Sequence, residues 1–296
     1  PSHYPFLNMH VDAANVPSEV LMEIAAVLDT FFQNGPPQGQ LFTSTTASDS
    51  KIMQREFLVK AFRVFQSIHN GEAFPTQWLS LHVTHAKVAV SALQWLLEIL
   101  ATNFVPSEDD TGVNDVMEFN PDLWELWFQI LIDLALGKMV SMETFTEQTR
   151  RAIWTIGGDI RADAANLLQR GWACLGWQAP PEYLQVLHPM DRVGGYQVGL
   201  STEVIPSVVR LCMGLHDQLQ SVGLDVLRSI IVSEWQLNEN LGVVQAAIIN
   251  AFDTMHRESA PIQSPFASAF LERLGKHFVI IKNTELHALY EAVMDV

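Results

Sequence analysis

Residues 119–177 decide the fold, and they read FNPDLWELWFQILIDLALGKMVSMETFTEQTRRAIWTIGGDIRADAANLLQRGWACLGW. Five of the eight tryptophans lie here, and we interpret the stretch as two helices joined by a turn. Pro121 favours the start of the first helix, because a first-turn proline gives up an amide that has no partner there. The polar residues of this helix fall on one narrow stripe, which means that most of its sides must be covered: Asp122, Glu125, Gln129 and Asp133.

The second helix is predicted to follow a turn in which Gly137 is the left-handed residue that ends the first helix. Thr146 or Thr144 is the expected cap, and Glu147 four residues before Arg151 adds a favourable pair. We expect it to continue to about residue 175, with a buried stripe of Ile153, Ile156, Ile160, Ala164 and Leu167.

The Gly157-Gly158 pair lies inside this predicted helix, where each glycine costs about 1 kcal/mol relative to alanine. A kink and a close approach by a neighbouring helix both explain the pair, and we favour the close approach because alanines follow. Asp159 and Asp163 are like charges four apart. Either another helix supplies their partners or water solvates them.

Tryptophans at helical spacing among Leu and Ile are expected to be core, although a ligand cage is the alternative. We therefore predict that Trp154→Ala destabilises the protein by about 3–5 kcal/mol, as a large truncation in the core does.

Part of the same stretch carries a family resemblance. Residues 145–177, FTEQTRRAIWTIGGDIRADAANLLQRGWACLGW, resemble the Dock (dedicator of cytokinesis) guanine nucleotide exchange factors for Rho-type GTPases. Residues 62–83 and 196–235 resemble the same proteins in the same order, so the resemblance covers roughly two thirds of the chain. The features that match are Phe145, Glu147, Gln148, Arg150, Arg151, Ala152, Trp154, Gly158, Asp159, Arg161, Ala165, Asn166, Leu167, Leu168, Trp172, Gly176 and Trp177.

The resemblance implies that this chain corresponds to the helical, armadillo-like region that lies ahead of the catalytic second Dock-homology region. It implies a non-catalytic scaffold that spaces the membrane-targeting and catalytic parts of a parent exchange factor for Rac- or Cdc42-like GTPases. The partners would be neighbouring domains, a Rho-family GTPase through the parent's catalytic region, and a second copy or an autoinhibitory segment. The location would be cytoplasmic, with recruitment of the parent to the membrane periphery.

Composition limits the class of protein and its partners without reference to the family resemblance. The 296 residues are 48% hydrophobic, enough for a large core, and the first residue is Pro1, which led us to expect a fragment. A net charge of −16 argues against nucleic acid and anionic membrane surfaces. No signal peptide or membrane-spanning run is evident. Cys174 and Cys212 are expected to be free buried thiols of a reducing compartment, with a disulfide as the alternative.

The remaining elements complete an all-α prediction: stacked helices in an armadillo/HEAT-like irregular solenoid, forming a single helical region over 1–296. Flexible connectors are predicted near 34–50, 105–120, 178–205 and 257–268. Helices are expected at 16–33, at 50–70 with Ser50 as the cap and Gly71 at the end, and at 75–103 behind Pro75. In the last of these, Lys87, Ser91, Gln94 and Glu98 form another narrow stripe. Further helices are expected at 205–221, 223–236, 240–256, 266–274 and 284–294, with no sheet.

No constellation carries chemistry convincingly. Asp109, Asp110 and Asp115 resemble a magnesium-binding acidic set, but Pro106 and Gly112 break any helix there. His82 and His85 lack a third metal ligand and are expected to be interior histidines.

His216 and Asp217 are adjacent on a helix and do not face each other, so Ser221 and Ser229 complete no triad. Gly194-Gly195 beside Arg192 is interpreted as a turn and not as a phosphate site. We therefore predict no catalytic, cofactor-binding or metal-binding residue and no cofactor. The first alternative is an unrelated helical-repeat interaction module, and the second is an all-helical metal-dependent enzyme.

Overall fold

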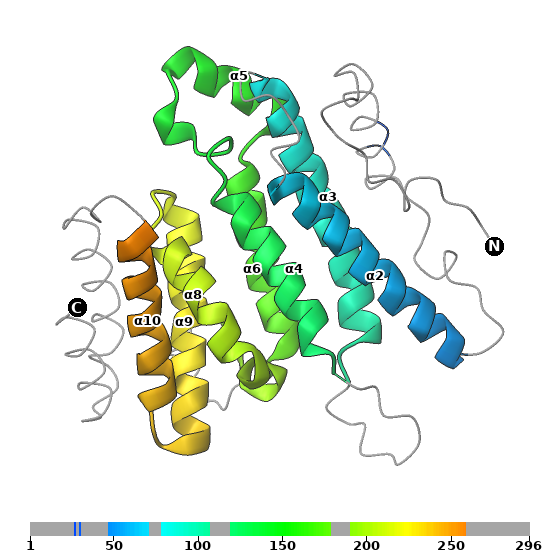
Figure 1. Ribbon diagram of the computed structural model, residues 1–296, viewed down its shortest axis with the longest axis vertical. Coiled ribbons are helices and arrows are strands. Elements are labelled where there is room, and N and C mark those ends of the chain that lie inside the picture. Colours follow the sequence, from blue (N-terminus) through cyan, green and yellow to red (C-terminus); the bar gives the residue numbers. More distant parts are fainter. Residues whose placement is uncertain are drawn as a thin grey trace. The chain divides into compact units, whose positions relative to one another are not determined.

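The computed structural model describes residues 47–70, 78–106, 119–178 and 190–258, and places Val27 and Thr30 in a helix. The fold is all-α, as predicted (Figure 1). The helices are α2 (Ala47–Asn70), α3 (Leu79–Asn103), α4 (Pro121–Ala135), α5 (Glu147–Gly157), α6 (Ile160–Leu175), α8 (Ser201–Cys212), α9 (Asp217–Asn238) and α10 (Gly242–Glu258), with 3₁₀ turns η4 (Met142–Thr144) and η5 (Gly195–Leu200).

A short antiparallel ladder corrects the prediction of no sheet. Strand β1 (Trp177–Gln178) pairs with β2 (Arg192–Val193), with Trp177 opposite Val193. It closes the connection between α6 and η5, inside a segment that we predicted to be a flexible connector.

Two compact units divide the chain, where we predicted one region. The first comprises Pro1–Asn103 and Gly137–Ile160, and the second comprises Phe104–Leu136 and Arg161–Val296. Each is described by itself below.

The first unit is built on α3, which packs against α2 and, near its beginning, against α5 (Figure 1). The predicted polar stripe of α3 is confirmed: Gln94 and Glu98 are exposed, Lys87 and Ser91 are half-buried, and the apolar positions around them are largely buried. Phe57 of α2 packs edge-on against Trp95 of α3, with ring centroids 6.3 Å apart.

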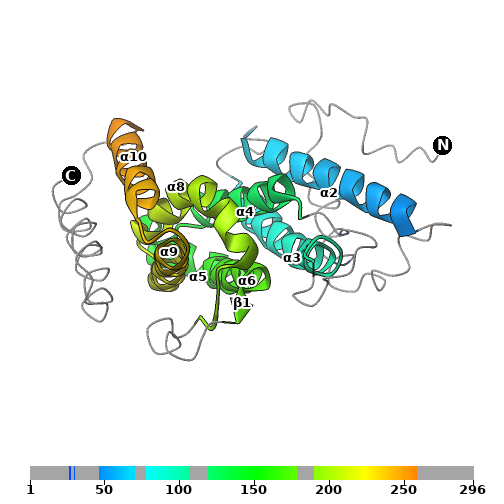
Figure 2. The same ribbon diagram turned by 90° about the horizontal axis from the view of Figure 1, so that it is seen from below.

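The second unit packs α8 against α4, α9 and α10. Helices α8, α9 and α10 lie side by side in both views (Figures 1 and 2). Asn120 caps α4 by accepting a hydrogen bond from the Leu123 amide at 3.3 Å, and Pro121 occupies the first turn as predicted. The core contains an aromatic cluster, in which Phe128 lies 5.0 Å from Trp127 and 5.7 Å from Trp172 between ring centroids.

The predicted second helix of the deciding stretch is in fact two helices. Thr146 caps α5 as expected, but α5 ends at Gly157, and Gly158 adopts a φ of 67° that no α-helix contains. Because the helix restarts at Ile160, the predicted stripe fails at Ile156, which is 39% exposed. Trp154, predicted to be core, is 56% exposed, so that prediction is wrong.

Several boundaries also differ. Gly137 is not left-handed, because α4 ends through Leu136 in an ordinary helical conformation. Ser50 lies inside α2, which begins at Ala47, in the end of the predicted connector 34–50.

The predicted helix 205–221 merges the end of α8 with the start of α9, and the predicted connector 257–268 begins inside α10. Apart from Val27 and Thr30, the predicted helix 16–33 lies outside the described residues. Gly71, Pro75, most of the predicted connector 105–120, and the helices predicted at 266–274 and 284–294 also lie outside the described residues. Among the described helices, none is long and apolar enough to cross a bilayer.

Candidate functional site

The residues singled out for chemistry are not brought together by the fold. His82 and His85 are half-buried on α3, and each is engaged by other groups of the protein. Asp109, Asp110 and Asp115 lie outside the described residues. Within the described ranges no three His, Cys, Asp or Glu side chains gather as metal ligands. The expectation that the chain has no catalytic, cofactor-binding or metal-binding residue stays a prediction.

His216 has a structural role that the sequence analysis missed. Its Nδ1 atom accepts a hydrogen bond from the Leu219 amide at 3.3 Å, which makes His216 the N-cap of α9. Asp217 and Ser221 are exposed, while Ser229 is fully buried. Asp217 does not orient His216 as the aspartate of a Ser-His-Asp triad does, because His216 Nδ1 accepts a hydrogen bond from the Leu219 amide and so has no proton to donate to a carboxylate.

The Gly194-Gly195 pair forms the predicted turn. Both glycines have positive φ, of 70° and 57°, which β-branched and bulky residues rarely adopt. Arg192, next to the turn, donates from Nε to the Gly176 carbonyl at 2.8 Å. A Cβ on Gly195 would lie 2.8 Å from the Leu175 carbonyl oxygen, so the turn packs tightly against the end of α6.

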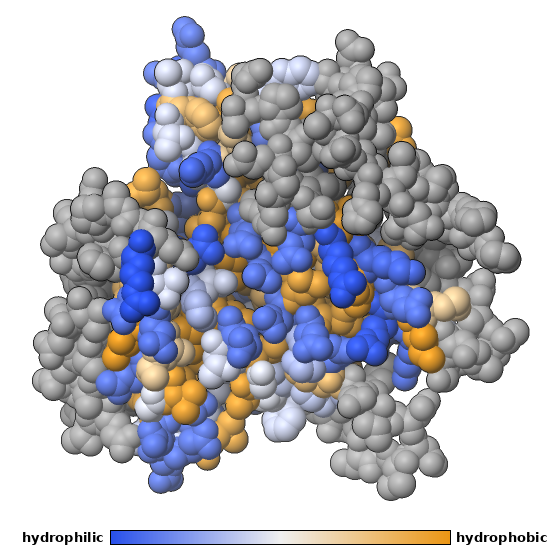
Figure 3. Space-filling view, in the orientation of Figure 1, coloured by the Kyte–Doolittle hydropathy of each residue, from blue (hydrophilic) through white to orange (hydrophobic). Residues whose placement is uncertain are grey.

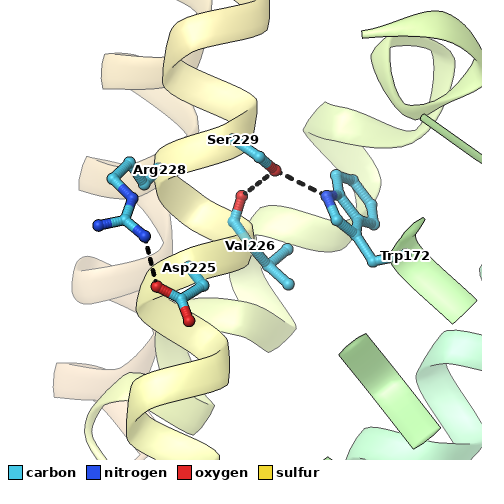
Figure 4. A network of polar contacts seen from close by, with 5 residues as sticks. All are labelled: Trp172, Asp225, Val226, Arg228 and Ser229. Atoms are coloured by element: carbon cyan, nitrogen blue, oxygen red, sulfur yellow. Dashed lines mark hydrogen bonds and ion pairs between the residues drawn. The ribbon is translucent and has the colours of Figure 1, made fainter. Parts of the chain in front are cut away.

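A buried polar network holds α6, α9 and this turn together, and Figure 4 shows the part of it made by Trp172, Ser229 and Val226. The Trp172 indole N–H donates to Ser229 Oγ at 2.7 Å, and Ser229 Oγ donates to the Val226 carbonyl at 2.8 Å. Ser233, one turn further along α9, accepts from the Gly194 amide at 2.9 Å. Gln197 donates to the Trp172 carbonyl at 2.8 Å. In the sequence, the only sign of this network was the spacing of Ser229 and Ser233, four residues apart in an apolar part of the helix.

An ion pair lies on the other side of α9 from Trp172 (Figure 4). Arg228 and Asp225 approach to 2.6 Å, with side chains only 4% and 9% exposed. Burial lowers the pKa of Arg228, and the Asp225 carboxylate opposes that shift. Removal of either partner would leave the other as a buried charge without its counter-ion, so we expect the loss of either residue to destabilise α9.

Both cysteines are free, as predicted. Cys212 is buried, with its sulfur 2.9 Å from the position that a Cβ on Gly223 would occupy. Burial raises the pKa of the Cys212 thiol, and nearby Asp225 raises it further. Burial also raises the pKa of the half-buried Cys174, against the effect of Arg170 and Arg192. Neither thiol is therefore activated as a nucleophile.

The surface of α5 is the other feature that sequence reasoning missed. Arg150, Arg151 and Trp154 are all exposed, and we call these three residues the Trp154 patch. Arg151 pairs with Glu147 at 2.5 Å, as predicted, and both side chains of this pair are largely in solvent. Figure 3 shows hydrophilic and hydrophobic residues intermixed on the visible face of the described part of the chain.

Comparison with known proteins gives a consistent result. Residues 26–184, more than half of the chain, match the family model described as the dedicator of cytokinesis (DOCK) TPR region. Dedicator of cytokinesis protein 3 of Mus musculus and of Homo sapiens are each 23% identical over 209 residues, 71% of this chain and 9% of the relative. Dedicator of cytokinesis protein 4 of Homo sapiens is 20% identical over 210 residues, again 71% of this chain and 9% of the relative. No solved structure matches significantly.

Proposed function

The chain belongs to the dedicator of cytokinesis (DOCK) family through its TPR region, and on this basis we propose that it is a non-catalytic helical scaffold within a larger guanine nucleotide exchange factor. It spans about 9% of the length of the curated relatives that it matches. The exchange activity and its Rac- or Cdc42-like GTPase substrate are assigned here to the rest of such a parent chain. Membership of the DOCK family removes the alternative of an unrelated helical-repeat module.

The observation that carries the proposal is the match of residues 26–184 to the DOCK TPR region. The described polar residues of the second unit support it, because they stabilise helix packing. Ser229 and Ser233 bind the turn and α6, His216 caps a helix, and Arg228 pairs with Asp225. Such interactions give a rigid element, which suits a spacer between the membrane-targeting and catalytic parts of a parent.

A nucleotide-release assay tests the proposal directly. We expect the 296-residue chain to leave the release of a fluorescent guanine nucleotide from Rac and Cdc42 at its intrinsic rate. A catalytic region of a DOCK relative serves as the positive control. Acceleration that rises with the concentration of the chain would overturn the proposal.

The proposed partners are the neighbouring domains of the parent chain and, for dimerisation or autoinhibition, a second copy or a segment of the parent. A pull-down with isolated neighbouring domains tests this part. If charge contributes, binding should weaken at high salt, because surface ion pairs are screened over about 8 Å at physiological ionic strength. The proposed location is the cytoplasm. Fractionation of cells that contain the parent protein tests this location.

A further inference from the structure

Helix α5 is attached to the first unit along one side only. Its buried residues are Ile153 and Gly157, which are four apart and therefore lie on one face. A Cβ on Gly157 would lie 2.7 Å from Val83 Cγ1, so this face rests closely on α3. The rest of α5 is held in a fixed position without being covered, which is the geometry of a presented surface.

The Trp154 patch occupies part of that uncovered surface. Arg150 and Arg151 precede Trp154 by four and three residues, so each arginine is a neighbour of Trp154 on the helix surface. Arg150 makes no side-chain hydrogen bond or ion pair with the described part of the chain. Arg151 pairs with Glu147, but their side chains are 80% and 68% exposed, and such pairs contribute little. Both guanidinium groups are thus accessible to a partner.

The residue types of the patch indicate a protein-binding site. Trp and Arg are the residues most enriched among those that dominate binding energy at interfaces. A 56% exposed indole offers apolar area, and a guanidinium binds carboxylates through paired hydrogen bonds. The fitting partner combines an apolar side chain for Trp154 with carboxylates for the two arginines.

The charge distribution decides between a peptide and a membrane. The whole chain carries −16, which repels an extended anionic bilayer or a nucleic acid. A short peptide interacts mainly with charges within about one Debye length, roughly 8 Å, and on α5 itself the two arginines outnumber the one acid, Glu147. We propose that the Trp154 patch docks a short acidic peptide segment that carries an apolar side chain. This inference goes beyond the scaffold role and does not depend on it.

The test measures fluorescence anisotropy of a fluorescein-labelled peptide of alternating glutamates and leucines, titrated with the full 296-residue chain. We expect saturable binding that Trp154→Ala and, separately, Arg150→Glu each weaken by about tenfold or more, as truncation of a dominant interface residue does. Ile156→Ala is the matched control, because Ile156 is exposed on the same helix but two positions from Trp154, and so on another face. We expect it to bind as the unchanged chain does.

Three outcomes would overturn the proposal: no binding of the acidic peptide, equal affinity for Trp154→Ala, or binding only to phosphatidylserine vesicles. A version of the peptide with lysine in place of glutamate should not bind. Helical circular dichroism confirms that each variant is folded, and the exposure of Trp154 and Arg150 makes a folding defect unexpected. None of these outcomes changes the expected result of the nucleotide-release assay, so the two proposals fail separately.

Discussion

Trp154 and Trp172 show how surroundings determine the role of a residue. The Trp172 ring is fully buried, packs against Phe128, and donates its indole N–H to Ser229. Trp154 lies on α5 with more than half of its surface in solvent. A large aromatic residue at helical spacing is therefore core in one case and surface in the other.

Truncation of the Trp172 ring should destabilise the protein strongly, and truncation of the Trp154 ring should hardly change its stability. We expect Trp172→Ala to lower the free energy of unfolding by about 3–5 kcal/mol, because it opens a cavity and leaves the Ser229 hydroxyl without this partner. Trp154→Ala should change it by about 0.5 kcal/mol or less, as surface substitutions do. Chemical denaturation followed by circular dichroism measures both. A loss of several kcal/mol at Trp154 would contradict its exposure.

The buried Cys212 thiol should make stability depend on alkaline pH. Because burial raises its pKa in the folded protein, the folded state keeps the proton while the unfolded thiol loses it above its ordinary pKa of about 8.5. The stabilising contribution is thus complete below about pH 8.5 and decreases as the pH rises, by about 2 kcal/mol at pH 10. We expect Cys212→Ala to lose less stability than the unchanged chain between pH 7 and pH 10. Parallel losses in both would contradict the prediction.

At the scale of single helices, the prediction succeeded where one periodic pattern continued without interruption. The polar stripes of α3 and α4 have the predicted phase, and Asn103 ends α3 as expected. It failed across Gly158, because the left-handed conformation of one glycine resets the helical phase and no count of apolar residues detects this. Trp154 and Ile156, which precede the break, are exposed because α5 buries Ile153 and Gly157 and not these two residues.

The buried network was beyond prediction for another reason. The pairing of Trp172 with Ser229 joins residues 57 positions apart, and only the tertiary packing of α6 on α9 brings them together. In the same way, nothing local shows that His216 caps α9, since His is not among the preferred capping residues.

The packing of α5 on α3 gives a prediction at this scale. Gly157→Ala should destabilise the first unit by about 1–3 kcal/mol, because the new methyl group would lie 2.7 Å from Val83 and 2.9 Å from Ile160. Gly199→Ala is the control, since a Cβ there meets nothing within 4 Å. Adding Val83→Ala to Gly157→Ala should recover part of the loss, measured by thermal denaturation. Additive effects of the two changes would contradict the proposed close approach.

At the scale of the molecule, the chain divides into two compact units, each of which can contribute separately to stability. Proteins with more than one such unit commonly depart from a single cooperative transition. We expect Gly157→Ala to lower the midpoint of one calorimetric transition and Ser229→Ala to lower that of another. The second effect arises because Trp172 would keep a buried N–H without its acceptor. A single transition shifted equally by both variants would show that the units unfold together.

The exposed indole on α5 also makes the protein its own optical probe. Trp124, Trp127 and Trp172 are sealed from solvent, so dissolved iodide should not quench their ultraviolet emission, whereas it should reach Trp177, which is 51% exposed, and the Trp154 ring on α5. A molecule bound over α5 would shield that ring and reduce the quenchable share of the emission. Occupancy of this helix can thus be followed without any added dye, in an unlabelled sample.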